Sequence, residues 1–381
     1  MTRLKLGFVG AGAINSRLMP HFLVDDTAAT VEVIGVCDPV LPRATAAAER
    51  FDNCKAYDSL DAMLADDRID AVTIGSPIGL HYQQVRAALI AGKHVHVNKT
   101  MTITTDEADD LIELARSKSL VLLPSPGEML RPHNRRIKEL IDTGEIGQLS
   151  WAVCGAAFGN YHVAEPERQG HDATTNVDPT WYFKNPGGGP LYDLTVYSLH
   201  GLTGILGPVK RVTALSGTLV PQRSLNGATV DVDVHDNTVM LLDFGANKFA
   251  LAYGTAAGNI TPGVEFDFSG RYYGTDGEII GLELNGEPFD YEGRTTARQA
   301  PDGGIHPNFG GNELILPHTT EGHWGLQELH VFEDIMQMVD WVRDGKASVV
   351  TAEHARHVIE IIELAYLAAE TGQTQALRTQ F

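Results

Sequence analysis

Residues 5–15 read Lys-Leu-Gly-Phe-Val-Gly-Ala-Gly-Ala-Ile-Asn, an apolar strand that runs straight into a glycine-rich turn and the start of a helix. Gly10 allows the tight turn, and Gly12 lets the backbone come close to a phosphate. Ala13 and Ile14 open the helix, whose free N–H groups and positive dipole end attract anions. This junction therefore predicts a pyrophosphate site.

A second strand supplies the context that a lone glycine pair lacks. Residues 31–37 form an apolar run, and Asp38 stands at its carboxyl end, where an acid can bind a ribose 2′-hydroxyl. Because a carboxylate disfavours a 2′-phosphate, we expect NAD as the cofactor in preference to NADP. Arg43 lies close enough to leave NADP open, and Asn15 stands where a third small residue is usual.

The composition favours a two-domain protein with a small-molecule partner. The chain has 381 residues, 43% of them hydrophobic, and a net charge of −20. Such a length allows a large core, and such a charge repels nucleic acid and anionic membranes. The three cysteines form no metal or redox motif. We find no signal segment and no apolar run long enough for a bilayer, so we expect a cytoplasmic protein with no membrane partner.

Apolar strands alternate with helical periods up to about residue 148, and the pattern then changes. Repeated strand and helix units predict a doubly wound parallel sheet, an α/β domain over residues 1–148. Longer, alternating strands predict an antiparallel sheet with one open face, in an α+β domain over residues 149–381. Two helices within about 326–371 are expected to pack back toward the first domain. The strands expected in the second domain include 230–244, 248–255 and 264–273.

Polar residues follow the carboxyl ends of two further expected strands of the first domain. Ser76, Pro77 and His81 come after one strand, and Asn98 and Lys99 come after the next. Doubly wound sheets bind their ligands at this edge, so we expect these five residues to contact the cofactor. Lys99 is also a candidate for the chemistry, with a solvated surface lysine as the alternative.

A second chemical cluster follows the glycine turn at 187–189. Asp193, Tyr197 and His200 stand at helical offsets that place a carboxylate, a phenol and an imidazole along one face. An ordinary tyrosine pKa is about 10, so the phenol serves near neutrality only beside a cation such as Lys99. Asp193 would orient the substrate hydroxyl or the lysine, and His200 would bind another hydroxyl or replace Tyr197 as the base. The alternative is a capped core helix.

These motifs together resemble the Gfo/Idh/MocA family, the group of glucose-fructose oxidoreductase and inositol dehydrogenase. The resemblance spans essentially the whole chain. It rests on Gly10-Ala-Gly12, Asp70-Ala-Val-Thr-Ile-Gly-Ser-Pro77 with His81, Ala91-Gly-Lys-His-Val-His-Val-Asn-Lys99, Thr143-Gly-Glu-Ile-Gly147 and Gly187-Gly-Gly-Pro-Leu-Tyr-Asp193. It implies an N-terminal Rossmann domain, a C-terminal domain with a large open antiparallel sheet, and a homodimer or homotetramer formed through that sheet.

Two family motifs are altered in this chain. The family's Glu-Lys-Pro motif falls on Asn98-Lys99-Thr100, which keeps the lysine but loses the proline that favours a cis peptide bond. The family's Asp-x-Gly-x-His/Tyr element falls on Asp193, Thr195 and Tyr197, so the chain is similar to the tyrosine variant. The resemblance implies that Lys99, Asp193 and Tyr197 are the catalytic residues.

Aromatic and imidazole side chains are candidates for substrate contacts. Trp181, His200, His318 and His323 suit a polyhydroxylated ring, with a place in the core as the alternative for Trp181. His318, His323 and His330 lie near acidic residues, but their spacing matches no metal signature, so we expect no metal.

The sequence predicts an NAD(P)-dependent oxidoreductase. It would transfer a hydride between nicotinamide and a secondary hydroxyl of a sugar, glycoside, cyclitol or sugar derivative, with Lys99 and Tyr197 handling the hydroxyl proton. One alternative keeps the cofactor bound, so that transient oxidation assists a net isomerisation, epimerisation or glycosidic cleavage. Another is a non-catalytic, nucleotide-sensing regulator on the same fold.

Overall fold

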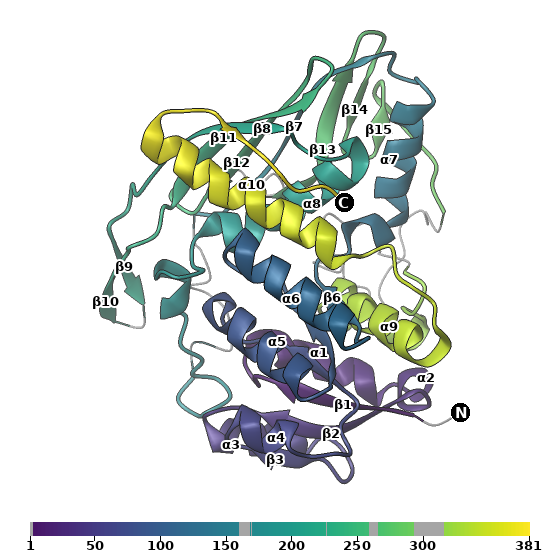
Figure 1. Cartoon of the computed structure of the whole chain (residues 1–381), viewed down its shortest axis with the longest axis vertical. Coiled ribbons are helices and arrows are strands. Elements are labelled where there is room, and N and C mark those ends of the chain that lie inside the picture. The colour runs from purple at the N-terminus through teal and green to yellow at the C-terminus, as the bar shows by residue number, and fades with distance from the viewer. Residues whose placement is uncertain (1–2, 160–167, 169, 226, 259–265, 293–315) are drawn as a thin grey trace.

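Two β-sheets lie one above the other along the long axis of the molecule (Figure 1). The computed structural model describes residues 3–159, 168, 170–225, 227–258, 266–292 and 316–381. The first sheet lies in the lower part of the view and the second sheet in the upper part. Strand β7 (Leu149–Ala157) enters the second sheet at the residue where we expect the second domain to begin. The division into domains itself stays a prediction.

The first sheet has six parallel strands in the order β3-β2-β1-β4-β5-β6. They are β1 (Leu4–Val9), β2 (Val31–Cys37), β3 (Lys55–Tyr57), β4 (Ala71–Ile74), β5 (His94–Val97) and β6 (Leu122–Pro124). The winding direction reverses between β1 and β4, so the carboxyl ends of these strands open a crevice for a ligand. The prediction of a doubly wound parallel sheet is confirmed.

Helices connect these strands, as the alternating pattern predicts. They are α1 (Ala13–Leu18), α2 (Asp25–Ala28), α3 (Leu41–Ala48), α4 (Leu60–Leu64), α5 (His81–Ile90) and α6 (Thr105–Ser117), with α7 (Pro132–Asp142) after the last strand. The start of α6 is fixed by a capping box. The Thr104 hydroxyl accepts from the Glu107 N–H at 3.2 Å, and the Glu107 carboxylate accepts from the Thr104 N–H at 3.3 Å.

The second sheet has nine strands in the order β16-β15-β14-β13-β7-β12-β11-β8-β17. Besides β7 they are β8 (Arg211–Gly217), β11 (Asn237–Gly245), β12 (Lys248–Thr255), β13 (Phe266–Gly274), β14 (Glu278–Ile280), β15 (Glu283–Leu284), β16 (Glu287–Pro288) and β17 (Gln375–Ala376). The strands are antiparallel except β7 and β12, which pair in parallel. The sheet is therefore mixed, which corrects the expectation of an antiparallel one.

The single strand expected over residues 230–244 is broken in two. β10 (Ala228–Asp231) pairs with β9 (Gln222–Leu225) in a separate hairpin, and β11 begins six residues after β10 ends. Asp236 lies in the break, and its buried carboxylate accepts from the N–H groups of Leu219 and Val220 at 2.7 and 3.0 Å. These bonds fix the position of Asp236 next to the start of β11.

The helices of the C-terminal half lie against both sheets. α8 (Val196–Leu206) and α10 (Ala352–Thr371) cover one face of the second sheet, whereas α9 (Leu329–Asp344) lies against β5 and β6 of the first (Figure 1). Within the described ranges, none of the helices combines the length and the apolar character that a bilayer-spanning segment needs.

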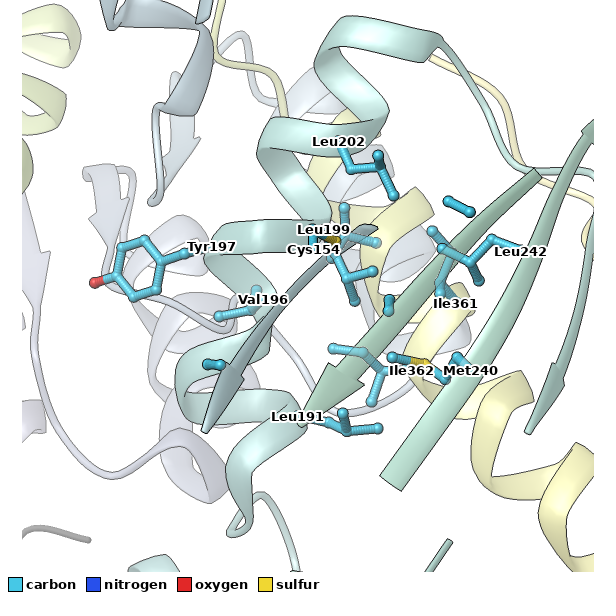
Figure 2. Packing of buried hydrophobic residues seen from close by; sticks show 14 of the residues in the cluster. Cys154, Leu191, Val196, Tyr197, Leu199, Leu202, Met240, Leu242, Ile361 and Ile362 are labelled. Atoms are coloured by element: carbon cyan, nitrogen blue, oxygen red, sulfur yellow. The ribbon is translucent and has the colours of Figure 1, made fainter. Parts of the chain in front are cut away.

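The core of the second sheet fixes the orientation of α8. Figure 2 shows Val196, Leu199 and Leu202 turned toward the strands, where Cys154 of β7 lies, while the ring of Tyr197 points the opposite way. These apolar side chains are fully buried. Because they fill the space between helix and sheet, they direct Tyr197 away from this core.

We predict that Leu199→Ala lowers the free energy of unfolding by about 2–5 kcal/mol, because the truncated side chain leaves a cavity. Urea unfolding followed by circular dichroism measures the change. Ile90→Ala is the matched control, since Ile90 on α5 is 51% exposed, and it should change the free energy by about 0.5 kcal/mol or less. Equal losses for the two variants would contradict the packing described here.

Candidate active site

A cavity of about 710 Å³ lies at the carboxyl edge of the first sheet. Every residue that we expected to hold the cofactor lines it except His81, and so do Trp181, Asp193 and Tyr197. Glu328 and His330 also line it, although we did not expect them in the site. The nucleotide motif and the Asp193 cluster therefore meet in one cavity.

Gly10 and Asn15 shape the glycine turn after β1. Gly10 has a φ of +87°, and a Cβ there would lie 3.2 Å from the carbonyl oxygen of Gly75. The Asn15 amide donates to the carbonyl oxygens of Val9 and Gly10 at 3.0 and 2.6 Å. A side-chain amide thus fixes the turn at the position where a third small residue is usual.

Asp38 joins the end of β2 to the glycine turn. Its carboxylate accepts from the N–H groups of Ala11 and Val40 at 2.9 and 2.8 Å, and from the Arg43 guanidinium at 3.3 Å. Asp38 and Arg43 both line the cavity. A glycine turn that approaches closely, with an acid beside it, fits the pyrophosphate and ribose of a dinucleotide.

Residues 170–178, which we call the 170–178 loop, lie over the glycine turn. A Cβ on Gly12 would lie 3.8 Å from Val177, and the Arg43 guanidinium donates to the carbonyl oxygen of Ala173 at 2.7 Å. The Asp172 carboxylate accepts from the Thr174 N–H at 2.8 Å, and its hydrogen bonds to this part of the loop lower its pKa to about 2. The loop is therefore organised by its own hydrogen bonds and tied to α3 by Arg43.

Lys99 and Asp193 form an ion pair across the cavity. The Lys99 ammonium donates to the Asp193 carboxylate, and also to its backbone carbonyl oxygen at 2.5 Å. The next residue, Thr100, donates from its hydroxyl to the Tyr192 carbonyl oxygen at 2.5 Å. The Lys99–Thr100 peptide bond is cis, although Thr100 replaces the family's proline. These contacts join the end of β5 to the π-helical turn Leu191–Thr195.

Tyr197 and His330 form the second pair of the cavity. The Tyr197 hydroxyl lies 3.1 Å from His330 Nε2. Burial, with the charges of Glu328 and Asp193, raises the pKa of Tyr197 well above its usual value. Burial, with nearby cations, lowers the pKa of His330 well below its usual value. Both groups are therefore uncharged near neutral pH, and the imidazole can accept the proton of the phenol.

Lys99 and Tyr197 lie close together, as the catalytic unit that we expected requires, and that role stays a prediction. The structure brings the Lys99 ammonium within 5.5 Å of the centroid of the Tyr197 ring. The ammonium donates to Asp193, however, and the phenol pairs with His330. The two residues share the cavity, but each has its own partner.

Glu328 completes the group around His330. Its backbone is left-handed, with a φ of +64°, immediately before α9. The carboxylate lies 3.6 Å from the Arg17 guanidinium and 3.8 Å from His330 Nε2. Sequence reasoning missed this group because His330 is 133 residues from Tyr197 in the chain. The histidine-rich stretch around His323 was the one available signal.

The structure does not bring His200, His318 or His323 to the cavity, which corrects our expectation that they line the substrate site. His200 is buried with its ring centroid 4.7 Å from that of His354. His318 faces two carboxylates of α9. His323 lies in the segment that precedes α9 and is fully buried against His21. Each imidazole therefore has a partner inside the protein.

His81 lies behind the cavity wall instead of in it. Its ring nitrogens face the carbonyl oxygens of Thr100 and Ser76, both at 2.8 Å. It therefore links the two loops that carry the expected cofactor contacts. Among the residues that the structure describes, no group of three histidine, cysteine or acidic side chains is arranged to hold a metal ion.

Two family models match the chain. The model described as "Oxidoreductase family, NAD-binding Rossmann fold" matches residues 4–125, and the model of the "GFO/IDH/MocA C-terminal domain" matches residues 134–280.

Curated relatives act on sugars and cyclitols. A dTDP-3,4-didehydro-2,6-dideoxy-alpha-D-glucose 3-reductase of Streptomyces antibioticus is 33% identical over 54% of this chain and 58% of its own length. A D-glucoside 3-dehydrogenase of Escherichia coli is 28% identical over 56% of this chain and 57% of its own length. The chain thus spans somewhat more than half the length of these two relatives. A scyllo-inositol 2-dehydrogenase (NADP(+)) of Bacillus subtilis is 27% identical over 85% of this chain and 83% of its own length.

Solved structures share the fold over the whole chain. Levoglucosan dehydrogenase in complex with NADH and L-sorbose superposes with a TM-score of 0.74 at 19% identity, covering 100% of both chains. GenD2 from gentamicin A biosynthesis, in complex with NAD, superposes with a TM-score of 0.72 at 21% identity, covering 100% of this chain and 97% of GenD2.

We predict a pH-dependent contribution of His318 to stability. Burial alone would lower the pKa of His318, but Glu333 at 2.9 Å and Asp340 at 3.3 Å outweigh it and raise the pKa. A raised pKa stabilises the folded state at low pH, and this contribution disappears as the pH rises through the folded value. Urea unfolding should therefore show that His318→Ala costs more stability at pH 5.5 than at pH 9. A cost that stays constant or grows with pH would contradict this.

Proposed function

Because the chain belongs to the Gfo/Idh/MocA oxidoreductase family, we propose that it transfers a hydride between NAD(P) and a secondary hydroxyl of a sugar, glycoside, cyclitol or sugar derivative. The observation that carries the proposal is the meeting of Lys99, Asp193, Tyr197 and His330 in the cavity that holds the glycine turn. The names of the relatives support carbohydrate-like substrates.

The cofactor would lie along the nucleotide motif. We assign its binding to Gly10, Gly12, Ala13, Ile14, Asp38, Ser76, Pro77, Asn98 and Lys99, all of which line the cavity. When bound, the nicotinamide accepts a hydride from carbon or returns it. The carboxylate of Asp38 supports NAD over NADP, whereas the neighbouring Arg43 offers a cation to a 2′-phosphate, so we propose NAD as the preferred cofactor.

The chain itself must move the hydroxyl proton. A neutral phenol cannot simply act as a base, but it can take the substrate proton on its oxygen while its own proton passes to His330 Nε2, 3.1 Å away. Burial disfavours the imidazolium that results, and the carboxylate of Glu328, 3.8 Å from that nitrogen, would offset part of this cost. Lys99, held by Asp193, places a positive charge beside the developing oxyanion. Trp181 lines the cavity and offers an aromatic face to a sugar ring.

We predict that Lys99→Met lowers kcat by about 10²–10⁴-fold while NAD still binds, because the oxyanion loses its neighbouring charge. Turnover is measured by NADH absorbance with a panel of sugars and cyclitols, and NAD binding by calorimetry. Lys93→Met is the matched control. Lys93 lies at the opposite end of β5, and its buried ammonium donates to the Ile69 carbonyl oxygen at 2.8 Å.

The control variant should lose stability and keep its turnover. Undiminished turnover in Lys99→Met would overturn the role of the lysine. Turnover by the wild-type protein also separates the proposal from a non-catalytic, nucleotide-sensing regulator.

The 170–178 loop favours one second candidate, a redox-neutral reaction on retained NAD. It covers the glycine turn and is tied to the first domain by the hydrogen bond from Arg43 to Ala173. A cofactor enclosed in this way would leave slowly, so a hydride taken from one carbon could return to the substrate in a later step. Net isomerisation, epimerisation or glycosidic cleavage would follow without release of NADH.

We predict that Asp172→Ala speeds the dissociation of NAD about tenfold, because the loop loses its internal hydrogen bonds. Stopped-flow fluorescence measures the rate. Asp243→Ala is the control, since Asp243 makes a similar bond to the Gly245 N–H in the β11–β12 turn and does not line the cavity. Equal rates in wild type and Asp172→Ala would contradict retention by the loop, and free NADH accumulating with substrate would contradict the redox-neutral reaction.

We propose that the chain forms a homodimer or homotetramer through the open face of the second sheet. Trp151, Leu215, Leu241 and Phe249 are between 45% and 81% exposed on four neighbouring strands. Trp151 lies directly beside Phe249 in the sheet register and stacks on Tyr273 with ring centroids 4.5 Å apart. A row of large exposed apolar side chains favours burial against a second copy.

A further inference from the structure

Two histidines from distant parts of the chain are buried together beside the start of α9. His21 lies in the 3-10 helix η1 (Met19–Leu23), and His323 ends the 3-10 helix η7 (Glu321–His323). Both side chains are fully buried. Their rings stack with centroids 5.1 Å apart, and each also stacks on Phe332 of α9, at 4.5 and 4.4 Å. The pair therefore links the first domain to the segment that leads into the cavity.

The hydrogen bonds of His21 fix its protonation. Its Nε2 lies 2.8 Å from the carbonyl oxygen of Gln327, which can only accept, so Nε2 carries a proton. Burial lowers the pKa of His21 to about 4, so the ring is neutral and its Nδ1 is an acceptor. That nitrogen lies 2.8 Å from His323 Nδ1, which must donate.

The second nitrogen of His323 faces an acid. His323 Nε2 lies 3.1 Å from the Asp26 carboxylate, which also accepts from the Thr320 hydroxyl at 2.6 Å. A directed chain results, in which His323 carries a proton on both ring nitrogens: Nε2 donates to the Asp26 carboxylate and Nδ1 donates to His21. His21 in turn donates to the Gln327 carbonyl oxygen. None of the three side chains of Asp26, His323 and His21 lines the cavity.

The Gln327 carbonyl belongs to the peptide unit that precedes Glu328. Glu328 has a left-handed backbone, which a side chain other than glycine adopts only when its surroundings impose it. Its carbonyl oxygen accepts from the Phe332 N–H at 3.0 Å and so starts α9. Two residues later, His330 reaches Tyr197 at 3.1 Å. The hydrogen bond to the Gln327 carbonyl oxygen therefore fixes the backbone turn that sets the orientation of the Glu328 and His330 side chains.

We propose that His21 and His323 are positioning residues for the proton path of the active site. They hold the Gln327–Glu328 turn so that the Glu328 carboxylate and the His330 imidazole meet the Tyr197 hydroxyl. This rests on the proposed function, in which Tyr197 and His330 move the proton. It gives His323 a role that its burial away from the cavity does not suggest.

The test compares His21→Ala with His21→Gln and with His357→Ala. In His21→Ala the His330 ring should lose its orientation toward Tyr197, and kcat should fall about tenfold to a hundredfold. The KM values for NAD and for substrate should stay within about twofold of wild type. His21→Gln should recover most of the loss, because its amide can donate to the Gln327 carbonyl oxygen. His357 is the matched control, since it is fully buried, burial lowers its pKa to about 4, and both ring nitrogens have hydrogen-bond partners far from the cavity. His357→Ala should lower Tm about as much as His21→Ala and leave kcat unchanged.

A wild-type kcat in folded His21→Ala would overturn the proposal, and so would an equal loss in His357→Ala. A readout that needs no turnover separates this proposal from the proposed function. The nitrogen NMR signal of His330 reports its hydrogen bond to Tyr197 in the protein without substrate. That signal should shift in His21→Ala and stay in place in His357→Ala. An unchanged signal overturns the positioning role even if the wild-type enzyme oxidises no sugar that is tested.

Discussion

The ion pair between Lys99 and Asp193 is the contact on which the active site depends. The two side chains are 11% and 2% exposed, and they join the end of a strand in the first sheet to the turn before α8. Removing one partner of a buried pair leaves an uncompensated charge, at a cost of about 3–5 kcal/mol. The pair therefore fixes the position of Lys99 and joins the end of β5 to the turn before α8 across the edge of the cavity. The hydrogen bond from Thr100 to Tyr192 supports the same junction.

The first sheet and its ligand edge could be predicted from the sequence because their signals are local. The glycine turn, Asp38 and the strand-end Lys99 each lie within a few residues of the strand that positions them, and all of them line the cavity. The parallel pairing of β7 with β12 could not be predicted, because residues about a hundred positions apart must meet and alternation along each strand does not give the direction of the partner. His330 was missed for the same reason.

His200 lies in the core, although its helical offset from Tyr197 predicts the same face of the helix. The offsets of Asp193, Tyr197 and His200 place them on one face of a uniform α-helix. The structure has a π-helical turn over Leu191–Thr195, in which the Val196 N–H bonds to the Leu191 carbonyl oxygen. The wider turn changes the position of Asp193 relative to α8, but Tyr197 and His200 lie within α8 itself, three residues apart. Tyr197 lines the cavity, whereas His200 is buried beside His354. A π-helical turn has no sequence signature that periodicity can detect, and such turns are frequent at functional sites.

The charges that line the cavity bear on the kind of substrate it favours. Lys99 pairs with Asp193, Arg17 with Glu328, and Arg43 with Asp38, so three of its cations already have acidic partners. A carboxylate or phosphate group on the substrate would have to compete with these acids for each cation, whereas a hydroxyl can share them through hydrogen bonds. Burial raises the pKa of Tyr197 and lowers the pKa of His330, so the phenol and the imidazole that we propose as the proton path are both uncharged near neutral pH. Cations that are already ion-paired, beside an uncharged tyrosine and histidine, suit a polyhydroxylated, uncharged ring, and this supports the carbohydrate-like substrate that we propose.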